Sequence, residues 1–280
     1  MADGRRASGI GGTLGEILVN EMTPQAIPRH LLAEPRIVTD PDDCFFYHTM
    51  DLPGLDTIHA HWDLRGRFDD YIGGVSVAGK TVLDVGTATG FLSFEAEKRG
   101  ASQVVSFDMS DVRQQTLMPF KDKDYYIDLE GWVRTYGAWF DGWRNAYWLC
   151  HRLLRSRASV VYGSVYEMPV DLGQFDVVIV GSVLEHLSDA VSALGSIARL
   201  TKETLVIVTP LLPDEEPIAH FAGRAAHPEN NFTWWVYSIG VYREVLGMLG
   251  FRIEQVTTST YYYEYGNIYE ERSTIVAVRD

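Results

Sequence analysis

Apolar positions recur along the chain in two patterns, as short continuous runs and as runs with helical spacing. The continuous runs are TVLDV (81–85), QVVSFD (103–108), ASVVYGSV (158–165), FDVVIVGSV (175–183) and TLVIVTP (204–210). FLSFEAEKR, ending at Gly100, and SDAVSALGSIARL, with Ser188 as its expected N-cap, place apolar residues along one helical face. This alternation predicts an α/β fold with a mostly parallel sheet that is buried on both faces.

The pattern changes towards the end of the chain. Ser238 is expected to open a helix that runs to Gly250, and the runs FRIEQVTT and STIVAVR follow as two strands around a tyrosine-rich segment. No helix separates these two strands, so they are predicted to pair antiparallel. Residues 56–72 have mixed helical spacing and are expected to form a helix.

The division of the chain follows from these patterns. Residues 1–55 are expected to form an N-terminal arm, rich in Gly and Pro up to residue 40, with a short helix possible around residues 15–20. Residues 56–280 would form the main domain. Two stretches interrupt its alternation, at 113–157 and 211–236, and such loops commonly build substrate walls.

Composition narrows the range of functions. The 280 residues carry a formal net charge of -14, which disfavours nucleic acid as a partner because its affinity comes largely from Lys and Arg. Two cysteines form no disulfide framework and suit a reducing cytoplasm. No signal peptide is expected, and no run approaches the roughly 20 apolar residues that cross a membrane. The oligomeric state is left open.

The segment VLDVGTATGFLS, residues 82–93, is the most informative in the chain. Asp84 precedes a turn bracketed by Gly86 and Gly90, where absent side chains allow a ligand to approach the backbone. The turn lacks the middle glycine of the G-x-G-x-x-G dinucleotide fingerprint and has no G-K-[ST] phosphate loop. An acid before the turn suits an amino group instead of a phosphate.

A second acid, Asp108, ends the next strand, where a carboxylate accepts hydrogen bonds from ribose hydroxyls. A nucleoside that carries an amino acid in place of phosphates is S-adenosylmethionine, so this is the expected cofactor. A plain Rossmann turn that binds another nucleotide is the alternative.

With these motifs, DVGTATG, SFD (106–108) and FDVVIVGSVLEHL (175–187), the chain resembles the class I S-adenosylmethionine-dependent methyltransferases. The resemblance covers roughly residues 57–280 and implies the Rossmann-like seven-stranded methyltransferase sandwich with an antiparallel last strand. It also implies the residues that bind the cofactor. Asp84, Gly86 and Gly90 would surround its amino acid end, Asp108 and the adjacent Met109 its ribose, and Ser164 and Val165 its adenine. Many members carry Asp at the position of Ser164.

In layout, the chain is similar to the branch of wobble-uridine (5-hydroxyuridine) transfer RNA methyltransferases. The similar parts are HWDLRGR before the glycine turn and TWWVYSIGVYREVLGMLGF late in the chain. The resemblance places Trp62 and Arg65 over the cofactor, where Arg65 would meet its carboxylate. The alternative for Arg65 is an ion pair with Asp69.

Two neighbouring residues are candidates for the catalytic base. His186 follows the fourth strand of the pattern, and its ordinary pKa of about 6.5 suits proton removal from a hydroxyl. Glu185 is the competing base, and a merely structural His186 is the alternative. His220 and His227 are weaker candidates.

Aromatic residues gather in both interruptions. Trp132, Tyr136, Trp139, Trp143 and Tyr147 recur every three or four residues along one helical face. Trp139 and Trp143 are expected to form one substrate wall, and Trp234 and Trp235 the opposite one. The alternatives are packing of the inserted helix for the first pair and anchoring of the following helix for the second.

No metal site is expected. His59 and His61 lie two residues apart and share no helix face, and neither H-E-x-x-H nor C-x-x-C occurs. A magnesium site built from scattered carboxylates stays open.

The sequence therefore predicts a methyltransferase that acts on a hydroxyl, or less readily an amine, of a small natural-product or sugar-like acceptor. Two alternatives remain. One is a transfer RNA wobble-uridine methyltransferase, for which Arg144, Arg152, Arg155 and Arg157 offer a basic cluster, and the other is a non-catalytic cofactor-binding protein.

Overall fold

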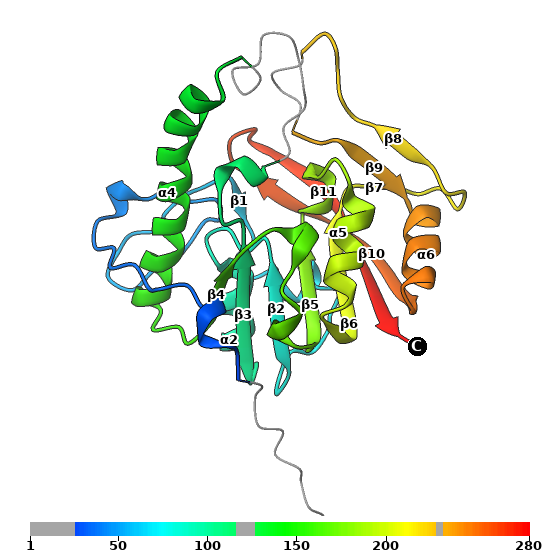
Figure 1. Cartoon of the computed structure of the whole chain (residues 1–280), viewed down its shortest axis with the longest axis horizontal. Coiled ribbons are helices and arrows are strands. Elements are labelled where there is room, and N and C mark those ends of the chain that lie inside the picture. Colours follow the sequence, from blue (N-terminus) through cyan, green and yellow to red (C-terminus); the bar gives the residue numbers. More distant parts are fainter. Residues whose placement is uncertain (1–25, 116–126, 228–231) are drawn as a thin grey trace, which may run out of the picture.

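The computed structural model describes residues 26–115, 127–227 and 232–280, and an eight-stranded sheet runs through its centre (Figure 1). The strand order is β1-β10-β11-β6-β5-β2-β3-β4. The strands are β1 (Trp62–Asp63), β2 (Thr81–Val85), β3 (Gln103–Asp108), β4 (Ser159–Tyr162), β5 (Phe175–Gly181), β6 (Thr201–Thr209), β10 (Phe251–Tyr263) and β11 (Ile268–Arg279). Strands β7, β8 and β9 form a separate small sheet.

Strands β2 to β6 are parallel, whereas β11 runs antiparallel to its neighbours β6 and β10. This arrangement confirms the predicted fold class, including the reversed last strand. The expected count of seven strands is exceeded by one, because the two-residue strand β1 pairs antiparallel with the end of β10.

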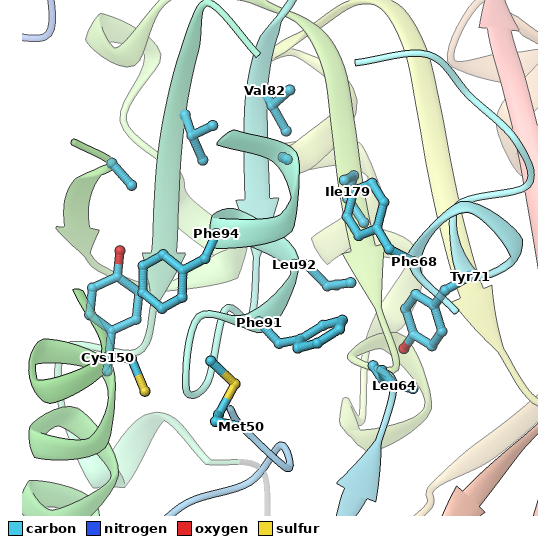
Figure 2. Packing of buried hydrophobic residues seen from close by; sticks show 14 of the residues in the cluster. Met50, Leu64, Phe68, Tyr71, Val82, Phe91, Leu92, Phe94, Cys150 and Ile179 are labelled. Carbon is cyan, nitrogen blue, oxygen red and sulfur yellow. The ribbon is translucent and has the colours of Figure 1, made fainter. Parts of the chain in front are cut away.

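The helices are α1 (Phe68–Tyr71), α2 (Phe91–Lys98), α4 (Leu129–Leu153), α5 (Ala190–Ala198) and α6 (Ile239–Met248). Alternate strand residues face opposite layers, which explains the continuous apolar runs. Val82 and Ile179 pack with α1, α2 and α4 on one face of the sheet. Figure 2 shows this layer from close by, with Phe91 and Phe94 of α2 near Cys150 of α4. Leu83 and Val180 pack with α5 and α6 on the other face.

The prediction of a helix over residues 56–72 was wrong for most of its length. Trp62 and Asp63 pair with Tyr263 and Tyr262 of β10, and helix appears only from Phe68 to Tyr71. Tertiary strand pairing overrides the local helical spacing here, because it satisfies backbone groups that a helix would otherwise have to pair.

The helix starts were predicted with different success. Ser238 caps α6 as expected, since its side chain accepts a hydrogen bond from the Val241 N–H. The expected cap Ser188 was wrong by one residue, because Asp189 accepts the hydrogen bond from the Ser192 N–H at the start of α5. Helix α2 ends just before Gly100, whose φ of 85° allows the chain to turn.

The two interruptions contribute structure at the edge where the parallel strands end. Helix α4 lies along one side of the molecule, and the small sheet β7-β9-β8 lies on the other (Figure 1). Its strands are β7 (Leu211–Leu212), β8 (Ala219–Phe221) and β9 (Trp235–Ser238). Of the N-terminal arm, Phe46, Met50 and Leu52 are buried in the core beside α2 and α4. The division into arm and domain stays a prediction.

The short helix expected around residues 15–20 lies outside the described residues. Among the helices of residues 26–115, 127–227 and 232–280, we find none with the length and apolarity that a membrane crossing requires.

Candidate active site

The glycine turn after β2 has an unusual backbone. Gly86, Ala88 and Gly90 all have positive φ values, of 77°, 51° and 87°. A Cβ atom on Gly86 would collide with the Val183 side chain, and one on Gly90 would collide with Phe94 and lie 2.9 Å from Tyr147 Cδ2. Glycine is therefore required at both ends of the turn, for its conformation and for the space.

Asp84 lies beneath this turn and is fully buried. Its Oδ2 atom accepts hydrogen bonds from Thr87 Oγ1 at 2.8 Å and Ser93 Oγ at 2.7 Å. Its Oδ1 atom is also buried and has no hydrogen-bond partner in the described part of the chain. Burial raises the pKa of Asp84 to about 6, although the hydrogen bonds from Ser93 and Thr87 oppose the rise.

Asp108 ends β3 beside the turn. Its carboxylate oxygens accept hydrogen bonds from the Ala88 N–H at 2.8 Å and the Met109 N–H at 2.7 Å. Burial raises its pKa, and these two backbone donors oppose the rise. A carboxylate has about four lone-pair sites, so each oxygen keeps acceptor capacity for a further donor such as a ribose hydroxyl.

The residues expected at the adenine lie next to this acid. The Gly163 N–H donates to the Asp108 carbonyl at 2.9 Å, which joins the end of β4 to the end of β3. Ser164 follows and caps a 3₁₀ turn over Val165–Glu167 by accepting a hydrogen bond from the Tyr166 N–H. The structure thus brings Ser164 and Val165 to the same strand edge as Met109, and their contact with the adenine stays a prediction.

A small cavity, almost filled by the surrounding side chains, lies between the glycine turn and helix α4. It is lined by Thr87, Ala88, Asp108, Met109, Phe140, Trp143, Arg144, Tyr147 and Tyr162. Sites for small molecules and cofactors usually measure roughly 300–1,000 Å³, far more than this cavity leaves open. The donor set suits a nucleoside, and side chains of α4 have to shift before one of ordinary size enters.

Arg144 is the charged residue of α4 that lines this cavity. Its guanidinium lies 4.2 Å from the ring centroid of Tyr162 and donates to the carbonyls of Met109 and Ser110 at 2.9 and 2.7 Å. Arg144 is therefore turned towards the cavity, whereas Arg152, Arg155 and Arg157 are exposed, and the basic cluster stays a prediction. Arg152 also turns to the chain, donating to the Val38 carbonyl at 2.9 Å.

Arg65 does not reach the cavity. It forms ion pairs with Asp63 at 2.7 Å and Asp51 at 2.8 Å, and its expected contact with the cofactor carboxylate stays a prediction. Asp69, the alternative partner, pairs instead with Arg99 at 2.7 Å. Arg65 lies in the turn that follows β1, two residues after Asp63.

Trp62 is also absent from the cavity lining. Its ring lies 5.0 Å from that of Tyr263 and 4.8 Å from the Arg272 guanidinium. Trp62 belongs to the edge strand β1, where it pairs with Tyr263 of β10, and its place over the cofactor stays a prediction.

The two candidate bases point in different directions from one 3₁₀ turn, Leu184–His186. Glu185 is 2% exposed, and His186 is exposed and bonds through Nδ1 to the Phe232 carbonyl at 2.7 Å. Glu185 Oε2 accepts a hydrogen bond from Thr209 Oγ1 at 3.4 Å, and Oε1 is buried with no partner among the described residues. A buried carboxylate oxygen with free acceptor capacity suits a base, and the choice between Glu185 and His186 stays a prediction.

The charge of Glu185 affects the pKa values of three tyrosines, Tyr47, Tyr71 and Tyr242. Burial, and then the charge of Glu185, raise the pKa of Tyr47 to about 12 and that of Tyr242 well above its ordinary range. Tyr71 responds in the same way, and its hydroxyl lies 3.3 Å from Ser182 Oγ at the end of β5. Ser182 has a φ of 51°, a strained value of the kind that gathers at functional sites.

Trp139 and Trp143 lie together, with ring centroids 4.9 Å apart. Phe45 contacts both, and Tyr47 lies 5.1 Å from Trp143. His61 joins the group at 5.3 Å from Phe45. These five rings, named here the arm–helix cluster, are mostly half-buried, and only Trp143 also lines the cavity.

Trp235 begins β9, Trp234 precedes it, and both contact the segment Glu185–Ser188. The Trp234 N–H donates to the Glu185 carbonyl at 2.8 Å, and Trp235 Nε1 donates to the Ser188 carbonyl at 3.1 Å. Trp235 thereby anchors the segment before α5. The anchoring role expected as the alternative was for the helix that follows Trp235, which is α6. The second wall stays a prediction.

Sequence reasoning missed His48 altogether. Both its backbone N–H and its Nδ1 atom lie within 3.1 Å of Thr89 Oγ1 in the glycine turn. Burial lowers the pKa of His48 to about 3, so its ring is neutral at ordinary pH. A lone histidine in the arm carries no periodic signal, and only the folded arm brings it to the turn.

Within the described ranges, no three His, Cys, Asp or Glu side chains come together as a metal site. His220 lies on β8, and the roles of His220 and His227 as weaker candidate bases stay predictions.

Comparisons with known proteins agree with this geometry. A family model described as a methyltransferase domain matches residues 64–256. No curated protein matches the chain. Among solved structures, the magnesium protoporphyrin IX methyltransferase of Synechocystis PCC 6803 with bound SAH has a TM-score of 0.51 at 16% identity, over 76% of this chain and 81% of that one.

A second similar structure is the 1,6-didemethyltoxoflavin-N1-methyltransferase of Burkholderia thailandensis, with a TM-score of 0.47 at 14% identity over 77% of each chain. A third is the mitomycin 7-O-methyltransferase, with a TM-score of 0.47 at 15% identity, over 76% of this chain and 53% of that one. At 16% identity, the likeness to the magnesium protoporphyrin IX methyltransferase shows a shared fold alone.

Proposed function

The chain belongs to the methyltransferase domain family and is an S-adenosylmethionine-dependent enzyme; on this premise we propose that it methylates a hydroxyl of a small-molecule acceptor. The observation that carries the choice of a hydroxyl is Glu185. Its unpartnered carboxylate oxygen is buried at the end of β5, where a proton acceptor is useful to an oxygen nucleophile.

The cofactor site in this proposal comprises the glycine turn, Asp84, Asp108 and the strand ends around Met109, Ser164 and Val165. Asp108 keeps acceptor capacity for ribose hydroxyls, and the bare backbone of Gly86 and Gly90 admits close approach. The negative charge of Asp84 and Asp108 favours a cationic ligand over a phosphate.

The chemistry divides between the cofactor and the chain. S-adenosylmethionine supplies an electrophilic methyl group on sulfur. Glu185 accepts the proton of the acceptor hydroxyl as the new carbon–oxygen bond forms and the carbon–sulfur bond breaks. Alignment of the two reactants supplies most of the rate, and a base adds about 10²- to 10⁴-fold.

The surroundings of Glu185 support a small acceptor with an apolar, ring-shaped body. Tyr47, whose pKa is raised by the charge of Glu185, belongs to the arm–helix cluster, so an acceptor that reaches the carboxylate would lie near aromatic faces. Closure of α4 over this region would exclude water.

The test is methyl transfer from isotopically labelled cofactor to fractionated metabolites of the producing cell, with mass analysis of the product. The proposal expects a product heavier by one methyl group on an oxygen of a small aromatic or sugar-like compound. Label that enters only transfer RNA would overturn it in favour of the wobble-uridine alternative. Absence of label from every fraction would favour a non-catalytic cofactor-binding protein.

A further inference from the structure

A chain of buried hydroxyl groups connects helix α4 to Asp84. Tyr147 Oη lies 2.8 Å from Ser106 Oγ, and Ser106 Oγ lies 2.6 Å from Ser93 Oγ. Ser93 Oγ in turn lies 2.7 Å from Asp84 Oδ2. All four side chains are buried, and they come from α4, β3, α2 and β2, so the chain crosses the whole layer under the cofactor turn.

The direction of these hydrogen bonds is fixed by Asp84. An ionised carboxylate only accepts, so Ser93 must give its single proton to Asp84. Ser93 can then only accept from Ser106, and Ser106 can only accept from Tyr147. Tyr147 is therefore the first donor of a chain in which every proton points to Asp84, and neighbouring bonds polarise one another in such a chain.

Tyr147 also touches the turn and the cavity directly. Its ring packs against Gly90 so closely that a Cβ atom there would lie 2.9 Å from Tyr147 Cδ2. The ring centroid lies 5.3 Å from that of Phe94, and the side chain lines the cavity beside Asp108. One residue of the covering helix thus contacts the glycine turn by its ring and the carboxylate beneath it through two serines.

We propose that Tyr147 is a positioning residue through which α4 holds the cofactor turn in its binding shape, by way of Ser106, Ser93 and Asp84. The inference rests on the proposed cofactor site. It assigns to the inserted helix a second role besides covering the cavity: α4 seated on the sheet orders the turn, and a seated α4 and a bound cofactor stabilise each other.

Titration of Asp84 gives this chain a measurable signature. Burial raises the pKa of Asp84 to about 6, with a further rise from the charge of Asp108, and Ser93 and Thr87 oppose it. Other titratable groups around this region are Tyr147 itself, Arg144 and Tyr162 near Asp108, and Glu97 and His151 near Tyr147. When Asp84 is protonated it no longer fixes the direction of the hydroxyl chain, so cofactor affinity should fall below about pH 6.

The experiment is calorimetric titration of S-adenosylhomocysteine into the full-length protein between pH 5 and pH 8. The variants are Tyr147→Phe, Ser106→Ala and the double variant. Tyr261→Phe is the matched control, because Tyr261 is another buried tyrosine but lies at the end of β10, outside the cofactor site. Thermal unfolding of each variant checks that it is folded.

Each single variant should weaken binding about 3- to 10-fold at pH 7.5, the range expected for one net hydrogen bond. Each should also move the pH of half-maximal affinity upward, because ionised Asp84 loses support. The double variant should bind about as weakly as the weaker single variant, since both interrupt one chain. Tyr261→Phe should match the wild type.

Two results would overturn the inference. One is wild-type affinity and an unmoved pH profile in Tyr147→Phe or in Ser106→Ala. The other is a double variant whose loss is the product of the single losses, which means that the residues act independently. Failure of the wild type to bind S-adenosylhomocysteine at any pH would instead refute the cofactor site proposed above.

Discussion

Replacement of Asp84 by Asn should change the pH dependence of stability. The free energy of unfolding of Asp84→Asn, minus that of the wild type, should rise from acid to neutral pH. Asp84 is fully buried, and burial raises its pKa from 3.8 to about 6. The folded protein therefore holds this proton more tightly than the unfolded chain does. Its contribution to the free energy of unfolding falls as the pH rises from about 4 to about 6, and it is constant above that range.

The size of the effect follows from the shift. About two pKa units correspond to about 3 kcal/mol, of which about 2 to 3 kcal/mol lies between pH 4 and pH 7. Asn has no such titration, so the unfolding free energy of Asp84→Asn minus that of the wild type should rise by this amount across the window. The constant part of the difference is not predicted, because Asn alters the hydrogen bonds with Thr87 and Ser93.

Urea unfolding of the cofactor-free protein at pH 4, 5, 6, 7 and 8 measures the difference. His48 titrates in the opposite sense: burial lowers its pKa from 6.5 to about 3, so its contribution to the unfolding free energy is lost as the pH falls below 6.5. Comparison of variant and wild type at each pH cancels that term.

Asp176→Asn is the matched control. Burial acts to raise the pKa of Asp176, but hydrogen bonds from Lys202 Nζ at 2.7 Å and the Thr81 N–H at 2.9 Å outweigh it and lower the pKa. This group therefore titrates below the window, and its difference from the wild type should stay constant from pH 5 to pH 8. A constant difference for Asp84→Asn as well, or one that falls with rising pH, would refute the reasoning about burial.

Two further predictions concern the turn and the base. Gly86→Ala places a Cβ atom against Val183 at a φ of 77°, so it should lower the free energy of unfolding by about 1 to 3 kcal/mol and weaken cofactor binding. The control Gly195→Ala lies in α5 with open space around it, so it should raise the free energy of unfolding by up to about 1 kcal/mol. Equal effects of the two variants in urea unfolding would contradict the described conformation of the turn. Glu185→Gln should lower kcat by about 10²- to 10⁴-fold with the affinity for S-adenosylhomocysteine unchanged, whereas His186→Ala should lose much less activity; the opposite ranking in steady-state kinetics would make His186 the base.

The central sheet could be predicted from the sequence because its strands are buried on both faces. Short apolar runs such as TVLDV and FDVVIVGSV are typical of strands covered on both faces. Acids lie at the ends of two such strands, and two glycines follow the first, which predicts a ligand site at this edge of the sheet. Gly86 and Gly90 occupy the strained positions that their residue type indicates.

The parts that could not be predicted depend on contacts between distant segments. Trp62 and Asp63 form a strand only because β10 offers a pairing partner, and the paired residues Asp63 and Tyr262 lie more than 190 positions apart in the sequence. The inward direction of Glu185 and the outward direction of His186 are set by a 3₁₀ turn that has no periodic signal. His48 and the hydroxyl chain from Tyr147 to Asp84 likewise appear only once four separate elements meet.

The most direct test of the central claim is calorimetric titration of S-adenosylhomocysteine into the wild type and Asp108→Asn. The account predicts one binding site per chain in the wild type. It also predicts about 10-fold or greater weakening in Asp108→Asn, because a charged acceptor for the ribose hydroxyls is lost. Wild-type affinity in Asp108→Asn, or no binding by the wild type while a dinucleotide binds well, would contradict it.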